Sequence, residues 1–288
     1  MQDDAAAPIA PRRRQPEPAP LPKLVVMPAF GLAVALAVWR GAPLWDEWRA
    51  LRHDWDRTRS TALVGYEDIH PVLEAAEPPG DWYREEGSAA ALWTGWRPGE
   101  GHRWFRFRVG EIPRHRLKGP LGRDALRAID RPVVERDGGG HWSRIAPDAL
   151  VASLDVTGTP SIYPLLLMSN VEVVNDEANG RPYLVVYSPA DDPRRPIEVF
   201  TPLLDGRRVT LGHSGYFLDK QPLLYDRGTE SLWTPRQEGL VAIAGPLKGR
   251  IFPRIARPAL VAWSDWKDSH THGRLIAGAD RSRGTPLH

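Results

Sequence analysis

A histidine, a serine and a carboxylate stand close together in the chain, at His213, Ser214 and Asp226. Catalysis by a serine nucleophile needs a histidine within hydrogen-bond reach and a carboxylate behind that histidine. Adjacent residues of a strand point to opposite faces, so His213 cannot easily pair with Ser214 directly. The chain also lacks the Gly-x-Ser-x-Gly elbow of hydrolases. The pattern therefore disfavours serine catalysis at this position.

A second polar group follows at once, where Asp226 and Glu230 flank Arg227. One interpretation is a clamp that orients a ligand. The other is a turn stabilised by an Asp–Arg or Glu–Arg pair, with Gly228 supplying the special backbone angle, and residue chemistry favours it. The candidate binding residues are those of both groups together with two aromatic neighbours: His213, Ser214, Tyr225, Asp226, Arg227, Glu230 and Trp233.

The sequence offers little for a metal or a cofactor. It contains no Cys, and its nine His residues show no zinc-type spacing. It has no phosphate loop, dinucleotide fingerprint or calcium-loop pattern. The Asn175-Asp176 pair is typical of a turn, and His270-Thr271-His272 lies in a polar stretch. We expect neither a metal nor a cofactor.

The charges are almost balanced, with 38 basic and 36 acidic residues and a net charge of +2. No basic run alternates with aromatic residues, so we expect no nucleic-acid partner. Gly and Pro number 26 and 29, which favours many turns and short strands. The predicted fold class is α+β, mainly antiparallel β.

Period-two patterns and turn residues predict the elements of a β-rich domain over residues 111–272. The predicted strands are 150–156, 182–187, 240–244 and 250–255, and a further strand at 103–109 precedes the domain. Two hairpins are expected, over 197–211 with a turn at Asp205-Gly206 and over 216–226 with a turn at Asp219-Lys220. Helical spacing of Leu260, Trp263 and Trp266 predicts a last helix over 257–270, before a polar tail at 273–288.

The chain before residue 111 has a different character. Residues 1–23 are rich in Ala and Pro and predict a disordered tail. Residues 24–40 predict a transmembrane anchor in the lipid bilayer, because residues 24–39 carry no charge and make about 24 Å of helix at ~1.5 Å per residue, near a ~30 Å hydrocarbon core. A cleaved signal peptide and a buried helix remain alternatives. Residues 41–110 predict a helical hook, where Trp45, Trp48 and Trp55 share one face, and an N-terminal extension.

Residues 111–270 resemble the bacterial family called domain of unknown function 3179. The resemblance rests mainly on GHSG at 212–215, LYDRGTESLW at 224–233, AGPL at 244–247 and WSDWK at 263–267, and less on IPR at 112–114, YPL at 163–165, Glu172 and VND at 174–176. Similar proteins carry a His where this chain has Val171, just before Glu172. They also carry two Cys, at the positions of Ser188 and Asp191. The resemblance thus implies a degenerate member without the family's thiol or metal chemistry.

Together these features predict a non-catalytic domain in the periplasm, held in a bacterial inner membrane with a cytoplasmic N-terminus. Its expected role is to bind or stabilise a protein partner, as an accessory subunit of a membrane complex. The twelve Trp residues suit such an interface. The alternative is an enzyme or a small-molecule binder with a pocket around His213, Asp226 and Glu230.

The anchor makes a first prediction. The protein should sediment with membranes, resist extraction by salt and keep its N-terminal tail, because an uncharged helix partitions into lipid. Fractionation and N-terminal sequencing test this. A mature N-terminus just after Ala35 or Ala37 would replace the anchor with a signal peptide.

Overall fold

The computed structural model describes residues 78–279, except positions 98, 137, 156–157, 191 and 193. The predicted tail at 1–23, the anchor at 24–40 and the helical hook lie outside the described residues. Within the described part of the chain, no helix has the length and hydropathy needed to cross a membrane.

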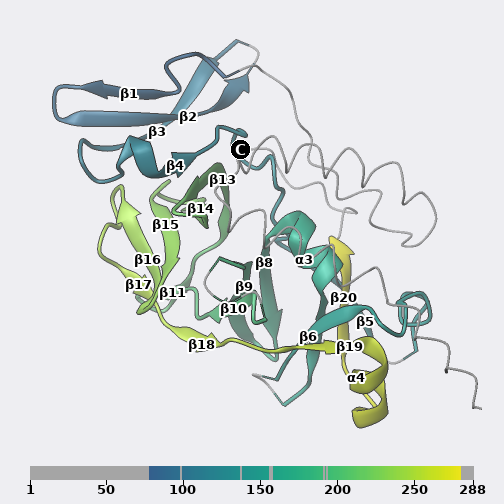
Figure 1. Cartoon of the computed structure of the whole chain (residues 1–288). Helices are drawn as coiled ribbons and strands as arrows, with labels where there is room; N and C mark the ends of the chain where they lie inside the picture. Colours follow the sequence, from purple (N-terminus) through teal and green to yellow (C-terminus); the bar gives the residue numbers. More distant parts are fainter. Residues whose placement is uncertain are drawn as a thin grey trace, which may run out of the picture.

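The described part of the chain folds mainly into antiparallel β-sheets, with two short helices, which confirms the predicted class at that level. A three-stranded meander comprises β1 (Tyr83–Glu86), β2 (Ala89–Arg97) and β3 (Gly101–Arg108). It stands beside a six-stranded sheet ordered β17-β16-β15-β14-β13-β4 (Figure 1). The six-stranded sheet comprises β4 (Leu117–Lys118), β13 (Leu211–Leu218), β14 (Gln221–Asp226), β15 (Leu232–Arg236), β16 (Gly239–Ala244) and β17 (Ile251–Phe252).

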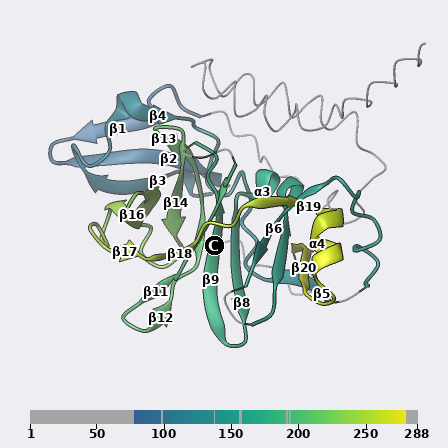
Figure 2. The ribbon, with the colours of Figure 1, turned by 60° about the horizontal axis from the view of Figure 1, so that its bottom comes forward.

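Two further sheets complete the other half of the molecule (Figure 2). The four-stranded sheet is ordered β18-β10-β9-β8 and comprises β8 (Val173–Ala178), β9 (Arg181–Tyr187), β10 (Ile197–Phe200) and β18 (Arg254–Ala256). The five-stranded sheet is ordered β19-β6-β7-β20-β5 and comprises β5 (Pro132–Arg136), β6 (Leu150–Leu154), β7 (Ser161–Pro164), β19 (Leu260–Ala262) and β20 (Arg274–Ala279). The helices are α3 (Leu165–Val171) and α4 (Trp263–Ser269).

The hairpin predicted over 216–226 is confirmed, because β13 pairs with β14 around Asp219 and Lys220. Both turn residues have positive φ, as a tight hairpin turn requires. The hairpin predicted over 197–211 is wrong in its extent. Only β11 (Leu203–Leu204) and β12 (Arg207–Arg208) pair across the Asp205-Gly206 turn, while β10 pairs with β9 and β18. Pro202 lacks an N–H and separates β10 from β11.

The C-terminal predictions need two corrections. The last helix begins only at Trp263, because Leu260–Ala262 forms β19 and pairs with β6. Residues 274–279, predicted as polar tail, form the buried strand β20 between β7 and β5. Its only charged side chain, Arg274, is buried and donates to Asp176 Oδ1 over 3.1 Å.

This ion pair also corrects the turn predicted at Asn175-Asp176, since both residues lie within β8. Asp176 is buried and accepts a hydrogen bond from the Tyr163 hydroxyl over 2.6 Å. Arg274 also donates to the Tyr183 hydroxyl over 2.8 Å. A buried charge of this kind is tolerated only when it is paired and hydrogen-bonded. The network therefore links the four- and five-stranded sheets.

Residues 119–130 cross from the meander to the other sheets through backbone hydrogen bonds. Arg123 N donates to Thr94 O over 2.6 Å, and Asp124 N donates to His213 O over 2.9 Å. Farther along, Ile129 N donates to Val173 O over 2.9 Å. This crossing segment thereby connects β2, β13 and β8.

The crossing segment can approach β13 only because that strand carries glycine at the contact. Gly215 has a φ of +90°, and a Cβ at this position would lie 2.3 Å from Gly122 O. The strand pairing shifts register between His213 and Tyr216, so the strand is bulged at this point. The close contact with the crossing segment therefore explains why the second glycine of the GHSG motif, Gly215, cannot carry a side chain.

Replacing Gly215 with Ala should lower the free energy of unfolding by about 3 kcal/mol, because the positive φ and the steric clash both add cost. Gly180 provides the matched control, since it has a φ of +72° but no atom within 4 Å of the place that an added Cβ would take. Gly180→Ala should cost about 1 kcal/mol. Chemical denaturation measures both, and equal losses would contradict the close contact.

Candidate functional site

The structure separates the predicted site residues into three places. Asp226 and Trp233 meet in the interior, while Tyr225, Arg227 and Glu230 face the crossing segment. His213 contacts a residue outside the predicted set, and the Ser214 hydroxyl donates to the Leu223 carbonyl. The set therefore does not form a single pocket.

Asp226 organises the loop between β14 and β15. Its Oδ1 accepts from the backbone N–H groups of Gly228 (3.1 Å) and Thr229 (2.5 Å). Its Oδ2 accepts from the Thr229 hydroxyl (2.8 Å), from Ser231 N (3.0 Å) and from Trp233 Nε1 (3.2 Å). A carboxylate has about four lone-pair sites, so these donors saturate Asp226.

The turn interpretation of this loop is supported, but two of its details are wrong. Arg227 pairs with neither flanking carboxylate, because Asp226 is satisfied by its own loop and Glu230 pairs with Arg123. The left-handed backbone angle belongs to Glu230, with a φ of +58°, and not to Gly228. Side-chain to backbone hydrogen bonds of a short carboxylate compete well with charge pairing in a turn, which explains the difference.

Arg227 instead pairs with two carboxylates of the crossing segment, Asp124 and Asp130. Its guanidinium lies 3.2 Å from Asp124 Oδ2 and 3.1 Å from Asp130 Oδ2. The Tyr225 hydroxyl donates to Asp124 Oδ2 over 2.6 Å and accepts from Arg227 over 2.9 Å. Burial raises the pKa of Asp130, an effect that Arg227 opposes and that the charge of Asp124 reinforces.

A second arginine completes this group. The Arg123 guanidinium pairs with Glu230 and lies 4.2 Å from the centre of the Tyr225 ring. We name the group the Arg123–Arg227 cluster, and it consists of Arg123, Asp124, Asp130, Tyr225, Arg227 and Glu230. Its two cations face three carboxylates, so each guanidinium has an acidic partner within the protein. Arg123 Nε, Asp124 Oδ1 and Arg227 Nε are buried without a hydrogen-bond partner among the described residues.

His213 forms a buried pair with Glu172 at the end of α3. His213 Nε2 lies 3.1 Å from Glu172 Oε2, although neither atom has an aligned hydrogen bond to any described residue. Gly215 N donates to His213 Nδ1 over 2.9 Å, which places the imidazole proton on Nε2, facing the carboxylate. Glu172 has a φ of +59°, so the backbone here is strained. Burial and the charge of Glu172 also raise the pKa of the neighbouring Tyr187.

Two of the positions where the resemblance implies a His and two Cys have structural roles in this chain. Val171 is fully buried among the apolar side chains around α3. Ser188 is buried and donates its hydroxyl to the Gln221 side chain. Asp191 lies outside the described residues. Among the residues described, no three His, Asp or Glu side chains are arranged to hold a metal ion.

Comparison with known proteins places these residues in a family. The profile described as protein of unknown function (DUF3179) matches residues 123–285, more than half of the chain. The chain is a DUF3179 protein. The predicted resemblance is confirmed, but the DUF3179 match begins at the crossing segment and extends beyond the predicted limit at residue 270. No curated protein and no solved structure matches the chain.

Sequence reasoning missed Glu172 as the contact of His213, and Arg123, Asp124 and Asp130 as members of the cluster. Glu172 already belonged to the DUF3179 pattern, so a signal for it existed. Nothing local marked the other three, because the crossing segment lies about a hundred positions before β14. Only the fold brings these segments together.

The role of Asp226 can be tested by Asp226→Ala. This change leaves several buried backbone and indole donors without an acceptor, so the free energy of unfolding should fall by about 3 kcal/mol. Asp205→Ala, which removes an exposed carboxylate paired with Arg250, should cost less than about 1 kcal/mol. Denaturation curves compare them. An unchanged melting temperature together with lost partner binding would show instead that Asp226 serves a ligand.

Proposed function

We propose that this DUF3179 protein is a membrane-anchored, non-catalytic periplasmic domain that binds or stabilises a protein partner, as an accessory subunit of a membrane complex. One observation carries the proposal. The polar residues that resemble an active site are used in internal contacts, with Asp226 saturated by its own loop and both arginines of the Arg123–Arg227 cluster paired with carboxylates.

The alternative of an enzyme or small-molecule binder at His213, Asp226 and Glu230 has less support. His213 and Asp226 are buried and point to different partners, Glu172 and the β14–β15 loop. A catalytic or binding group must be accessible to its substrate, and these two are not.

The surface that we expect to suit a partner is aliphatic. Among the described residues Trp96 is 46% exposed, whereas Trp93, Trp142, Trp233, Trp263 and Trp266 are buried. Residues 251–262 instead supply the edge strand of three successive sheets through β17, β18 and β19 (Figure 1). Ile251, Ile255 and Val261 are 46%, 44% and 36% exposed along this segment. We name it the edge segment.

Two arginines that stand beside these exposed positions turn away from the edge. Arg254 and Arg257 both pair with Glu198, which is completely buried in β10. Arg254 also donates to the backbone carbonyls of Arg236 and Gln237. Charged side chains normally protect an edge strand against pairing, so their inward pairing leaves the aliphatic side chains uncovered. An extended apolar segment of another protein fits this edge by strand addition.

The double variant Ile255→Lys, Val261→Lys should remove partner binding while the melting temperature stays close to that of the parent, because both side chains are exposed. Val109→Lys is the matched control, since Val109 is 40% exposed at a turn of the meander. The full chain is extracted gently from membranes and the co-purifying protein is quantified.

The possible outcomes distinguish a wrong binding surface from a wrong proposed function. Loss of a stoichiometric partner in the double variant alone supports the edge segment. Equal recovery in both variants contradicts the edge segment, and no stoichiometric partner with the parent chain contradicts the proposed function itself.

A further inference from the structure

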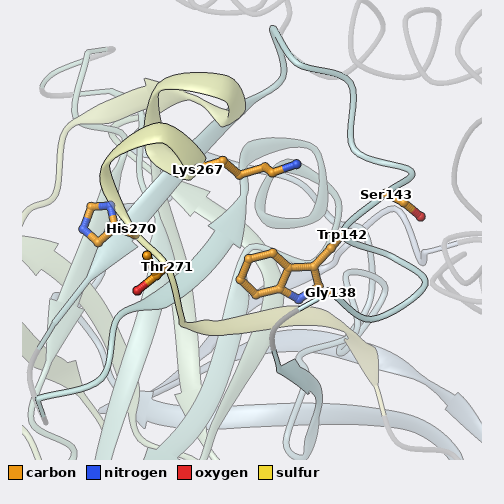
Figure 3. A pocket seen from close by; sticks show the side chains of 6 residues that line it. All are labelled: Gly138, Trp142, Ser143, Lys267, His270 and Thr271. Carbon is orange, nitrogen blue, oxygen red and sulfur yellow. The ribbon is translucent and has the colours of Figure 1, made fainter.

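Cations gather at one end of the six-stranded sheet. Three segments supply them, at residues 114–118 around β4, at the β13–β14 turn and at the end of β15. By contrast, Lys267 is the only lysine or arginine among the residues that line the shallow hollow between α4 and the loop after β5 (Figure 3). We name the gathered group the basic end, and it consists of Arg114, Arg116, Lys118, Lys220 and Arg236.

Antiparallel pairing brings the three segments of the basic end together. Leu117 of β4 pairs with Leu218 of β13, and Asp219 N then donates to Arg116 O over 3.2 Å. β14 leads away from the β13–β14 turn and β15 returns beside it, so Arg236 at the end of β15 also reaches Asp219. The fold thus assembles cations from segments that lie far apart in the chain.

The basic end holds more positive charge than its own carboxylates can match. Arg116 Nε donates to Asp219 Oδ1 over 2.7 Å, and Arg236 Nη1 lies 3.7 Å from Asp219 Oδ2. Across residues 78–279 as far as they are described, no carboxylate pairs with the other three cations. Residues 114–118, 219–220 and 236–238 contain five cations and two carboxylates, a net charge of +3, whereas the whole chain carries only +2.

The charges of the basic end are accessible to another molecule. Arg114, Arg116 and Lys118 are exposed, while Lys220 and Arg236 are half-buried. The aromatic ring beside them is Trp82, which is half-buried and contacts both Arg114, at 5.5 Å, and the Tyr216 ring, at 5.6 Å. A site for single-stranded nucleic acid combines cations with open aromatic platforms on which bases stack. The basic end therefore suits recognition by charge, without base stacking.

The basic end also adjoins the edge segment. Arg254, at the start of β18, donates to the backbone carbonyls of Arg236 and Gln237. In the same place β16 begins after the turn at 237–238, and its Leu240 pairs with Phe252 of β17. A protein segment that pairs along the edge segment therefore meets the basic end at the boundary between them.

We propose that the basic end binds an acidic segment of the protein partner, an inference that deepens the proposed function and rests on it for the identity of that partner. The carboxylates of this segment pair with Arg114, Lys118 and Lys220, the cations without an acidic partner. A single exposed ion pair contributes little, so recognition depends on several cations acting together. Complementary charge of this kind mainly speeds association and selects the partner.

Fluorescence anisotropy of the full chain in a non-ionic detergent tests the proposal. The probe is a fluorescein-labelled peptide of alternating glutamate and serine, and the matched peptide carries glutamine in place of glutamate. The acidic peptide should bind saturably at an ionic strength of about 0.1 M. Its affinity should fall at least about tenfold at about 1 M, where the screening length is only about 3 Å. The glutamine peptide should show no saturable binding.

Three variants locate the site. The double variant Arg114→Gln, Lys118→Gln should weaken binding of the acidic peptide about tenfold. Arg106→Gln, Arg108→Gln is the matched control, since it removes the same charge from exposed positions of β3 and should change the affinity less than about twofold. Asp219→Asn should tighten binding about threefold, because it frees two arginines. Asparagine also suits the φ of +51° at this turn, and a gain in affinity cannot come from unfolding.

Several results would overturn the proposal. They are the absence of saturable binding, equal losses in the two double variants, and a failure of Asp219→Asn to tighten binding. Tighter binding of a single-stranded oligonucleotide of equal charge, lost in Arg114→Gln, Lys118→Gln, would assign the basic end to nucleic acid instead. Loss of peptide binding when phosphatidylglycerol replaces phosphatidylcholine around the chain in nanodiscs would assign it to lipid headgroups.

The peptide titration uses no natural partner, so its failure is distinct from failure of the proposed function. Peptide binding at the basic end, with no protein that co-purifies with the parent chain, would support the basic end and contradict the proposed function. A partner recovered equally with the parent chain and with Arg114→Gln, Lys118→Gln would contradict the basic end and support the proposed function.

Discussion

Residues 119–130 must pass within backbone hydrogen-bonding distance of β13, and only glycine at residue 215 permits this approach. The crossing segment then bonds to β2, β13 and β8, so three sheets share one set of backbone contacts. Because the backbone groups of this segment are satisfied by strands of different sheets, the segment belongs to the core although it has almost no regular structure of its own. The same path carries Arg123, Asp124 and Asp130 to the loop after β14.

This arrangement explains why most of the candidate site is occupied by internal contacts. The loop after β14 is held from within by Asp226, and Arg227 and Glu230 pair with the crossing segment. A buried or half-buried charge needs partners that compensate it, and here each arginine of the cluster has a carboxylate partner within the protein. Val171 and Ser188, where the resemblance implies a His and a Cys, serve packing and hydrogen bonding in this chain.

The chain leaves apolar surface uncovered at the edge segment. This segment exposes aliphatic side chains along three sheet edges because Glu198 draws both neighbouring arginines inward. Surfaces that offer unmet contacts are where recognition of another molecule gains most free energy.

The sequence by itself determined the elements that depend on local chemistry. The 216–226 hairpin follows from its two-residue turn, the antiparallel class follows from short strands separated by turns rich in Gly and Pro, and the DUF3179 pattern follows from LYDRGTESLW. Tertiary structure decided the rest. The sequence predicted that Arg274 begins a polar tail. In the structure Arg274 pairs with Asp176 in the interior, and β20 is a core strand. His213 contacts Glu172 and not Asp226. Contacts between distant segments depend on how the sheets pack, and no local pattern of residues encodes that packing.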